Sequence, residues 1–130
     1  MSDVYDKLDN TTQPDLQAAK LGTLIEGAPV VVKVVIDADY TGEKSVTIPY
    51  DMEVIDVVVQ CTAANSNGTL TLKNGGHAVT DAIACAVDTT IDRAATIDDA
   101  YSTLYTTSTV TVDANGANDR GIMWIIGYRI

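Results

Sequence analysis

The sequence contains no phenylalanine, a single tryptophan and a single histidine among its 130 residues. Because phenylalanine is absent, the core has to be built from valine, isoleucine, leucine and alanine. The β-branched residues of this set, with many threonines beside them, suit a half-buried pleated sheet. The histidine, His77, follows Gly75-Gly76. We predict an exposed turn residue there, because a catalytic base needs a positioned partner.

Basic residues are also scarce, since 8 lysines and arginines stand against 18 aspartates and glutamates, a net charge of -10. A nucleic-acid binder neutralises phosphates with basic side chains, so this balance argues against that class of protein. It argues equally against electrostatic docking to an anionic membrane. The acidic surface either keeps copies of the chain apart in solution or docks onto a basic partner surface.

Long apolar runs are missing too, and none approaches the roughly 20 residues that a membrane-spanning helix needs. The first ten residues are polar and acidic, without the apolar stretch of a signal peptide. We therefore expect a cytosolic origin, and Cys61 and Cys85 to be buried and reduced. Two cysteines at this spacing form no metal motif, and a disulfide between them stays open.

Candidate chemical groups are few. Asp37-x-Asp39 and Asp98-Asp99 offer the carboxylate oxygens that Ca²⁺ prefers, but neither has EF-hand spacing, and solvated turns are the plainer interpretation. No nucleophile elbow, Walker loop or His-Glu-x-x-His motif is present. We therefore predict no catalytic residue, no cofactor, no cofactor-binding residue, no metal ligand and no enzymatic activity. The arginines Arg93, Arg120 and Arg129 either pair across a subunit contact, hold a loop or are solvated.

The chain divides near residue 27. Residues 1–27 are polar, and we predict an N-terminal arm that is disordered or ordered against a neighbouring subunit. Within it, Pro14-Asp15 favours a short helix through Leu21. Residues 28–130 form one domain of ordinary size.

The domain shows the period-two alternation of β-strands. The strand-like segments are 30–36, 45–48, 54–61, 69–73, 79–87, 89–105, 109–112 and 122–130. Of these, 79–87 is ambiguous between a strand and a short helix, and 89–105 carries mixed signals. About eight strands, separated by turn residues, predict an all-β fold, an antiparallel β-sandwich of the jelly-roll type. In 54–61 we expect Ile55, Val57, Val59 and Cys61 to share one face.

Three strand-and-turn segments carry a resemblance to a known class of proteins. They are Val46-Thr47-Ile48-Pro49-Tyr50-Asp51, Gly68 to Gly76, and Thr109-Val110-Thr111-Val112 with Asn115-Gly116-Ala117. Together they resemble the small head decoration (cement) proteins and related virion proteins of tailed bacteriophages, over about the last two thirds of the chain. The resemblance implies copies clustered on the capsid exterior, often as homotrimers, with the major capsid protein as partner. It implies no catalytic residue.

Two functions follow as hypotheses. The first is a virion structural protein that decorates and stabilises the capsid. Its trimer would bury the apolar residues left over on strands such as Val30–Ile36 and Met123–Arg129, which are apolar on both faces. The alternative is a carbohydrate- or receptor-binding β module, in which loop tyrosines stack on sugars. Those tyrosines are Tyr40, Tyr50, Tyr101 and Tyr105.

Overall fold

The computed structural model describes residues 27–36, 42–62, 68–85, 87, 89–115 and 120–130. These residues form ten strands and no helix. The strands are β1 (Pro29–Ile36), β2 (Gly42–Val46), β3 (Met52–Cys61), β4 (Thr69–Asn74), β5 (His77–Ala78), β6 (Ile83–Ala84), β7 (Ile91–Arg93), β8 (Thr103–Leu104), β9 (Val110–Ala114) and β10 (Gly121–Arg129). The described residues therefore contain no helix that is long and apolar enough to cross a membrane.

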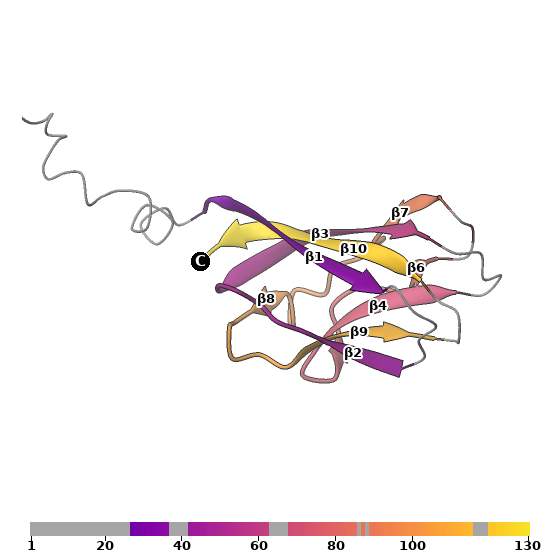
Figure 1. The fold of residues 1–130 in the computed structure, drawn as a ribbon. Coiled ribbons are helices and arrows are strands. Elements are labelled where there is room, and N and C mark those ends of the chain that lie inside the picture. Colours follow the sequence, from indigo (N-terminus) through magenta and orange to yellow (C-terminus); the bar gives the residue numbers. More distant parts are fainter. Residues whose placement is uncertain (1–26, 37–41, 63–67, 86, 88, 116–119) are drawn as a thin grey trace, which may run out of the picture.

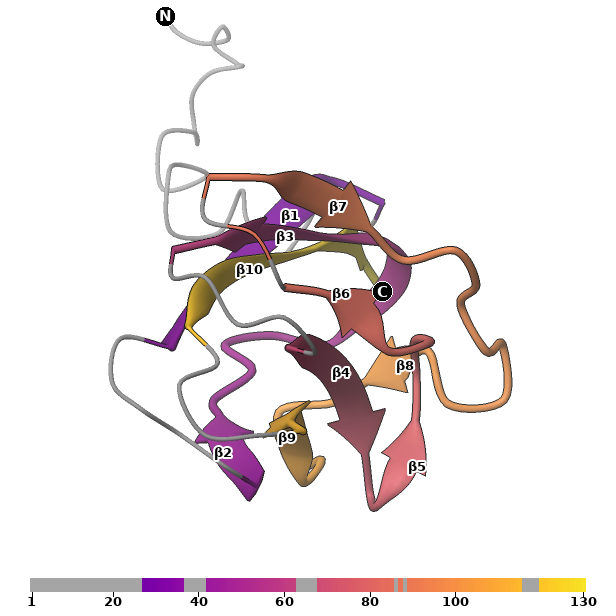
Figure 2. The same cartoon turned by 90° about the vertical axis from the view of Figure 1, so that its right-hand side faces the viewer.

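The strands pair into two antiparallel sheets of five strands each. The first sheet has the order β1-β10-β3-β7, with β8 also on β3, and the second has the order β2-β9-β4-β5, with β6 also on β4. Figures 1 and 2 show the two sheets as separate layers. The prediction of an all-β sandwich is confirmed. The jelly-roll type stays a prediction.

The core lies between the layers and draws on both sheets. Its best buried aliphatic and methionine side chains, each at most 1% exposed, include Ile36, Met52, Val57, Val59, Leu70, Leu72, Val112, Met123 and Ile125. A core of this size is therefore built without phenylalanine. Cys61 and Cys85 are both buried thiols, 1% and 0% exposed, as predicted.

Alternation works as predicted in several strands. In β1, Val30 and Val34 are buried while Val31 is 55% exposed. In β4, Leu70 and Leu72 point inward, and Thr69 and Thr71, which alternate with them, are only half-buried. The turn after β4 uses Gly75 and Gly76 with φ angles of 60° and 85°, which glycine adopts without strain.

The prediction for β3 is wrong at Ile55, which is 58% exposed instead of sharing the buried face of Val57. The cause is a β-bulge: β10 shifts its register against β3 between Ile126 and Gly127. A bulge inserts one residue without a partner, so the inward face passes from Val54 to Val57.

Boundaries also differ from the sequence expectation. The segment 45–48 is strand only to Val46, and β2 begins earlier, at Gly42. Within 79–87, only Ile83–Ala84 is regular strand. The mixed segment 89–105 contains β7 and β8. The count rises from eight to ten because β5, of two residues, lies outside the expected segments and because 89–105 holds two strands instead of one.

Several expectations lie outside the described residues. These are the arm except Gly27, the helix from Pro14-Asp15 to Leu21, Asp37-x-Asp39, Tyr40 and the turn residues 65–67 and 116–117. Both sheets lie within residues 28–130, and the division into an arm and a domain stays a prediction.

Candidate functional site

The side of the first sheet that points away from the core is mostly apolar. We call it the outer face and define it by the register of four adjacent strands. Its residues are Val31, Lys33 and Val35 of β1, Ile122, Trp124 and Ile126 of β10, Asp56, Val58 and Gln60 of β3, and Ile91 and Arg93 of β7. Seven of these eleven side chains are apolar.

Trp124, the only tryptophan of the chain, lies in the middle of the outer face. In the sheet register it stands opposite Lys33 on one side and Val58 on the other. Ile122 and Ile126 flank it along β10, because side chains two residues apart share a face. The ring therefore has aliphatic neighbours in Val58, Ile122 and Ile126 and a lysine on its fourth side, and it remains partly open to solvent.

The periphery of the outer face is well exposed. Val31 is 55% and Ile91 is 66% exposed, although both are large aliphatic residues. Charge is confined to Lys33 and to an ion pair in which Arg93 Nη2 lies 2.7 Å from Asp56 Oδ2. A shallow groove of about 240 Å³, lined by Val58 and the three residues of β7, indents the face beside this pair.

The second sheet has a polar outer face, which provides the contrast. Lys73 Nζ lies 2.8 Å from Glu43 Oε2 and 3.6 Å from Asp113 Oδ2. The Thr111 hydroxyl donates to Glu43 Oε1 at 3.1 Å. These hydrogen bonds from Lys73 and Thr111 lower the pKa of Glu43, and the bond to Glu43 raises the pKa of Lys73. The outer face of the second sheet is therefore polar and charged, whereas the outer face of the first sheet is mostly apolar.

The size of the outer face limits what it can do alone. Four strands about 4.8 Å apart, over five residues of about 3.4 Å each, span on the order of 300 Å² of sheet. A specific interface buries about 800 Å² of accessible surface on each partner. The outer face thus fits the apolar centre of an interface, with further contacts needed around it.

The predicted absence of a chemical centre can be compared with individual residues. His77 is exposed at the start of β5, as predicted, and its ring stacks on Tyr101 with centroids 4.2 Å apart. Asp98 uses Oδ1 to accept the Ala100 N–H at 2.9 Å, as a turn carboxylate does. In the described ranges, no three histidine, cysteine, aspartate or glutamate residues are grouped as metal ligands would be.

The tyrosines proposed for sugar stacking have protein neighbours. The Arg129 Cζ atom lies over the Tyr50 ring, 4.7 Å from its centroid, and the Tyr101 ring stacks against that of His77. Tyr105 is 48% exposed. Of the three arginines, Arg93 pairs with Asp56 and Arg129 lies over Tyr50; the bond that Arg120 accepts from the Cys85 thiol, at 3.0 Å, is to its main-chain carbonyl.

The outer face was only half visible in the sequence. Apolar residues on both sides of β1 and β10 indicate it, but Val58 and Ile91 join it through strand pairing over long sequence separations. Ile91 lies in a three-residue strand, too short for alternation to reveal its face.

Comparison of the chain with protein-family models, with curated proteins and with solved structures finds no match. The class that the structure defines is an all-β protein with two antiparallel sheets and one apolar outer face. Its function is therefore inferred from its own residues.

Proposed function

We propose that this protein is a virion structural protein that decorates and stabilises the capsid of a tailed bacteriophage. It works as a homo-oligomer, with a trimer favoured, on the capsid exterior after synthesis in the host cytoplasm. Its partner is the major capsid protein. The observation that carries this proposal is the outer face, where Trp124 and its aliphatic neighbours meet solvent.

An apolar sheet face of this kind has a recognised physical meaning. Contiguous exposed apolar patches of several hundred Å² mark contact surfaces in soluble proteins. The centres of protein interfaces are depleted of charge and enriched in aromatic residues. The outer face has one tryptophan at its centre with Lys33 beside it, and its ion pair lies at the β3–β7 side.

The net negative charge of the chain disfavours association through any surface other than the apolar outer face. The net charge of -10 makes copies repel each other at a distance. Contact is then favourable only where the apolar burial is large enough to exceed that repulsion. On a shell, many such modest contacts act together, so affinity accumulates through multivalency.

The resemblance to decoration proteins adds the choice of partner. Its three segments fall on β2 and the turn after it, on the β4–β5 hairpin, and on β9 with the residues that follow. Successive long strands also cross from one sheet to the other, from β1 to β2 to β3 to β4, which supports the jelly-roll type.

The test measures molar mass by light scattering and then co-sedimentation with empty, expanded capsids of tailed bacteriophages. We expect a defined oligomer that sediments saturably with capsids. Ile122→Asn on the outer face weakens both properties, whereas Thr71→Asn on the polar face of β4 leaves them unchanged. A protein that stays monomeric at all concentrations and does not sediment with any capsid would refute the proposal. Retention on a glycan array would favour a sugar-binding module instead.

A further inference from the structure

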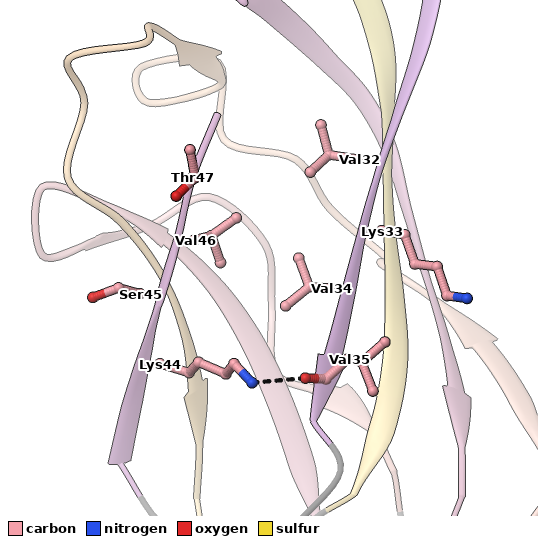
Figure 3. Close-up of a pocket in the computed structure, with 8 residues that line it drawn as sticks. All are labelled: Val32, Lys33, Val34, Val35, Lys44, Ser45, Val46 and Thr47. Carbon is pink, nitrogen blue, oxygen red and sulfur yellow. Dashed lines mark hydrogen bonds between the residues drawn. The ribbon is translucent and has the colours of Figure 1, made fainter. Parts of the chain in front are cut away.

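β1 and β2 are edge strands of opposite sheets that lie next to each other. β1 pairs with β10, and β2 pairs with β9, on one side only among the described strands. Between them runs a groove of about 420 Å³, lined by residues 32–35 and 44–47. Figure 3 shows the two strands as the walls of this opening.

The backbone of β1 offers hydrogen bonds to the groove. Lys44 Nζ donates to the Val35 carbonyl at 2.9 Å, so this carbonyl points away from β10. At the other end, the Ala28 carbonyl accepts the Arg129 N–H at 2.9 Å and points toward β10. Because these directions alternate along a strand, Val31 and Lys33 also direct their N–H and C=O groups to the open edge. An added strand finds a row of donors and acceptors there.

The interior of the groove is apolar. Val32, Val34 and Val46 point into the space between the strands, whereas Lys33 points away from it (Figure 3). Val32 and Val46 are only partly buried against the core. Apolar side chains from an incoming strand would complete their burial.

Charge at the groove favours an acidic occupant. Lys44 reaches across the groove, whereas Lys33 lies on the other, outer side of the β1 edge, so an added strand would have one lysine on each of its sides (Figure 3). Neither lysine has a carboxylate partner among the described residues, unlike Lys73 and Arg93. Lysine on an edge strand opposes pairing with an identical strand, because two copies bring the same charge together. An extended segment with carboxylates is therefore the complementary ligand.

The chain itself contains a matching segment, Asp3-Val4-Tyr5-Asp6-Lys7-Leu8-Asp9. Val4, Asp6 and Leu8 would share one side of a strand. Val4 and Leu8 would contact the groove valines, and Asp6 would lie within reach of the Lys44 ammonium. We propose that residues 3–9 of a second copy add as a strand to the open edge of β1, above the groove.

Chain length and direction favour a second copy as the donor. The residues between Asp9 and Gly27 span up to about 60 Å when extended. The Gly27 N–H donates to the Arg129 carbonyl at 2.7 Å, so the pairing with β10 continues in line with β1 as far as Gly27, the first described residue. The inference rests on the homo-oligomer of the proposed function but needs no capsid. It also supplies the contact area that the outer face lacks.

A charge swap in the full-length protein tests the inference. We expect Lys33→Glu/Lys44→Glu and Asp3→Lys/Asp6→Lys each to raise the concentration at which the oligomer half-dissociates by about tenfold or more. An equimolar mixture of the two variants restores most of the association, because the lysine-bearing segment then fits the glutamate-bearing groove; in a closed trimer, two of the three contacts become complementary and one still joins identical variants. Asp98→Lys/Asp99→Lys, in the loop between β7 and β8, has the same change in net charge as the second variant and serves as its control. Unaltered association of both variants overturns the inference.

Hydrogen exchange locates the contact. We expect slow exchange at the amides of Val31, Lys33 and Val35 in the oligomer, and fast exchange in Asp3→Lys/Asp6→Lys. Protection that persists in a monomer would show insertion within one chain and overturn the second-copy assignment. Fast exchange in the intact oligomer would leave the outer face as its contact and also refute strand addition. Successful charge rescue without capsid binding would refute the capsid role alone.

Discussion

The backbone of Gly127 in β10 passes so close to the Glu53 carbonyl of β3 that a Cβ atom there would collide with it. The bulge beside Gly127 depends on this close approach. We predict that Gly127→Ala separates β10 from β3 and lowers the free energy of unfolding by about 3 kcal/mol or more. Urea denaturation measures the loss.

Gly75→Ala provides the matched comparison. A Cβ atom at Gly75 would meet no atom within 4 Å, and only its φ of 60° opposes alanine. We expect a loss of about 1 kcal/mol there. Equal losses at the two glycines would contradict the steric account of the bulge.

Trp124 is an intrinsic probe of the outer face, because no other tryptophan contributes to the fluorescence. We predict that emission shifts to longer wavelength on dilution, as the oligomer separates and the ring meets water. Val58→Ala, which removes aliphatic contact beside the ring, moves that transition to higher concentration, by about tenfold for a central contact. An emission maximum independent of concentration, with a changing molar mass, would place Trp124 outside the interface.

Glu43 makes the free energy of unfolding depend on pH in the acidic range. Its folded pKa is lowered, first by the hydrogen bond from Lys73, so its stabilising effect is present above the usual value of 4.5. That effect is lost as the pH falls through the lowered pKa. We predict that Glu43→Gln flattens the acid side of a plot of unfolding free energy against pH. Thr71→Asn, a substitution on the same polar face that removes no carboxylate, leaves that slope unchanged.

Thr89 holds a φ angle of 69°, which a β-branched residue rarely adopts. We predict that Thr89→Gly stabilises the fold by about 0.5 to 1 kcal/mol, because the strain is relieved at some cost in chain entropy. Thr90→Gly should destabilise, since the Thr90 hydroxyl donates to the Val87 carbonyl at 2.6 Å. Thermal unfolding of both variants measures the difference in sign.

Alternation along a strand is a local property, and the sequence predicts it well. Val30 and Val34 of β1 are buried because each second residue returns to the same face. Leu70 and Leu72 of β4 follow the same rule, as does the turn at Gly75. The all-β sandwich and half of the outer face could therefore be predicted before any coordinates existed.

Pairing between distant strands is not local, and the predictions fail there. Ile55 is exposed because Gly127, far along the chain, allows a bulge opposite it. Ile91 reaches the outer face because its strand pairs with Gln60. The residues adjacent to Ile55 and Ile91 in the sequence therefore do not determine the exposure of either side chain.

The opposed outer faces make each molecule a small two-sided amphiphile. At an air–water boundary, Trp124 would turn toward the air and Glu43 toward the liquid. Isolated copies in a thin vitrified film would then present mainly one projection to an electron beam. Copies whose tryptophan is covered by a neighbour would tumble freely and give a full range of views, so the spread of orientations itself reports assembly.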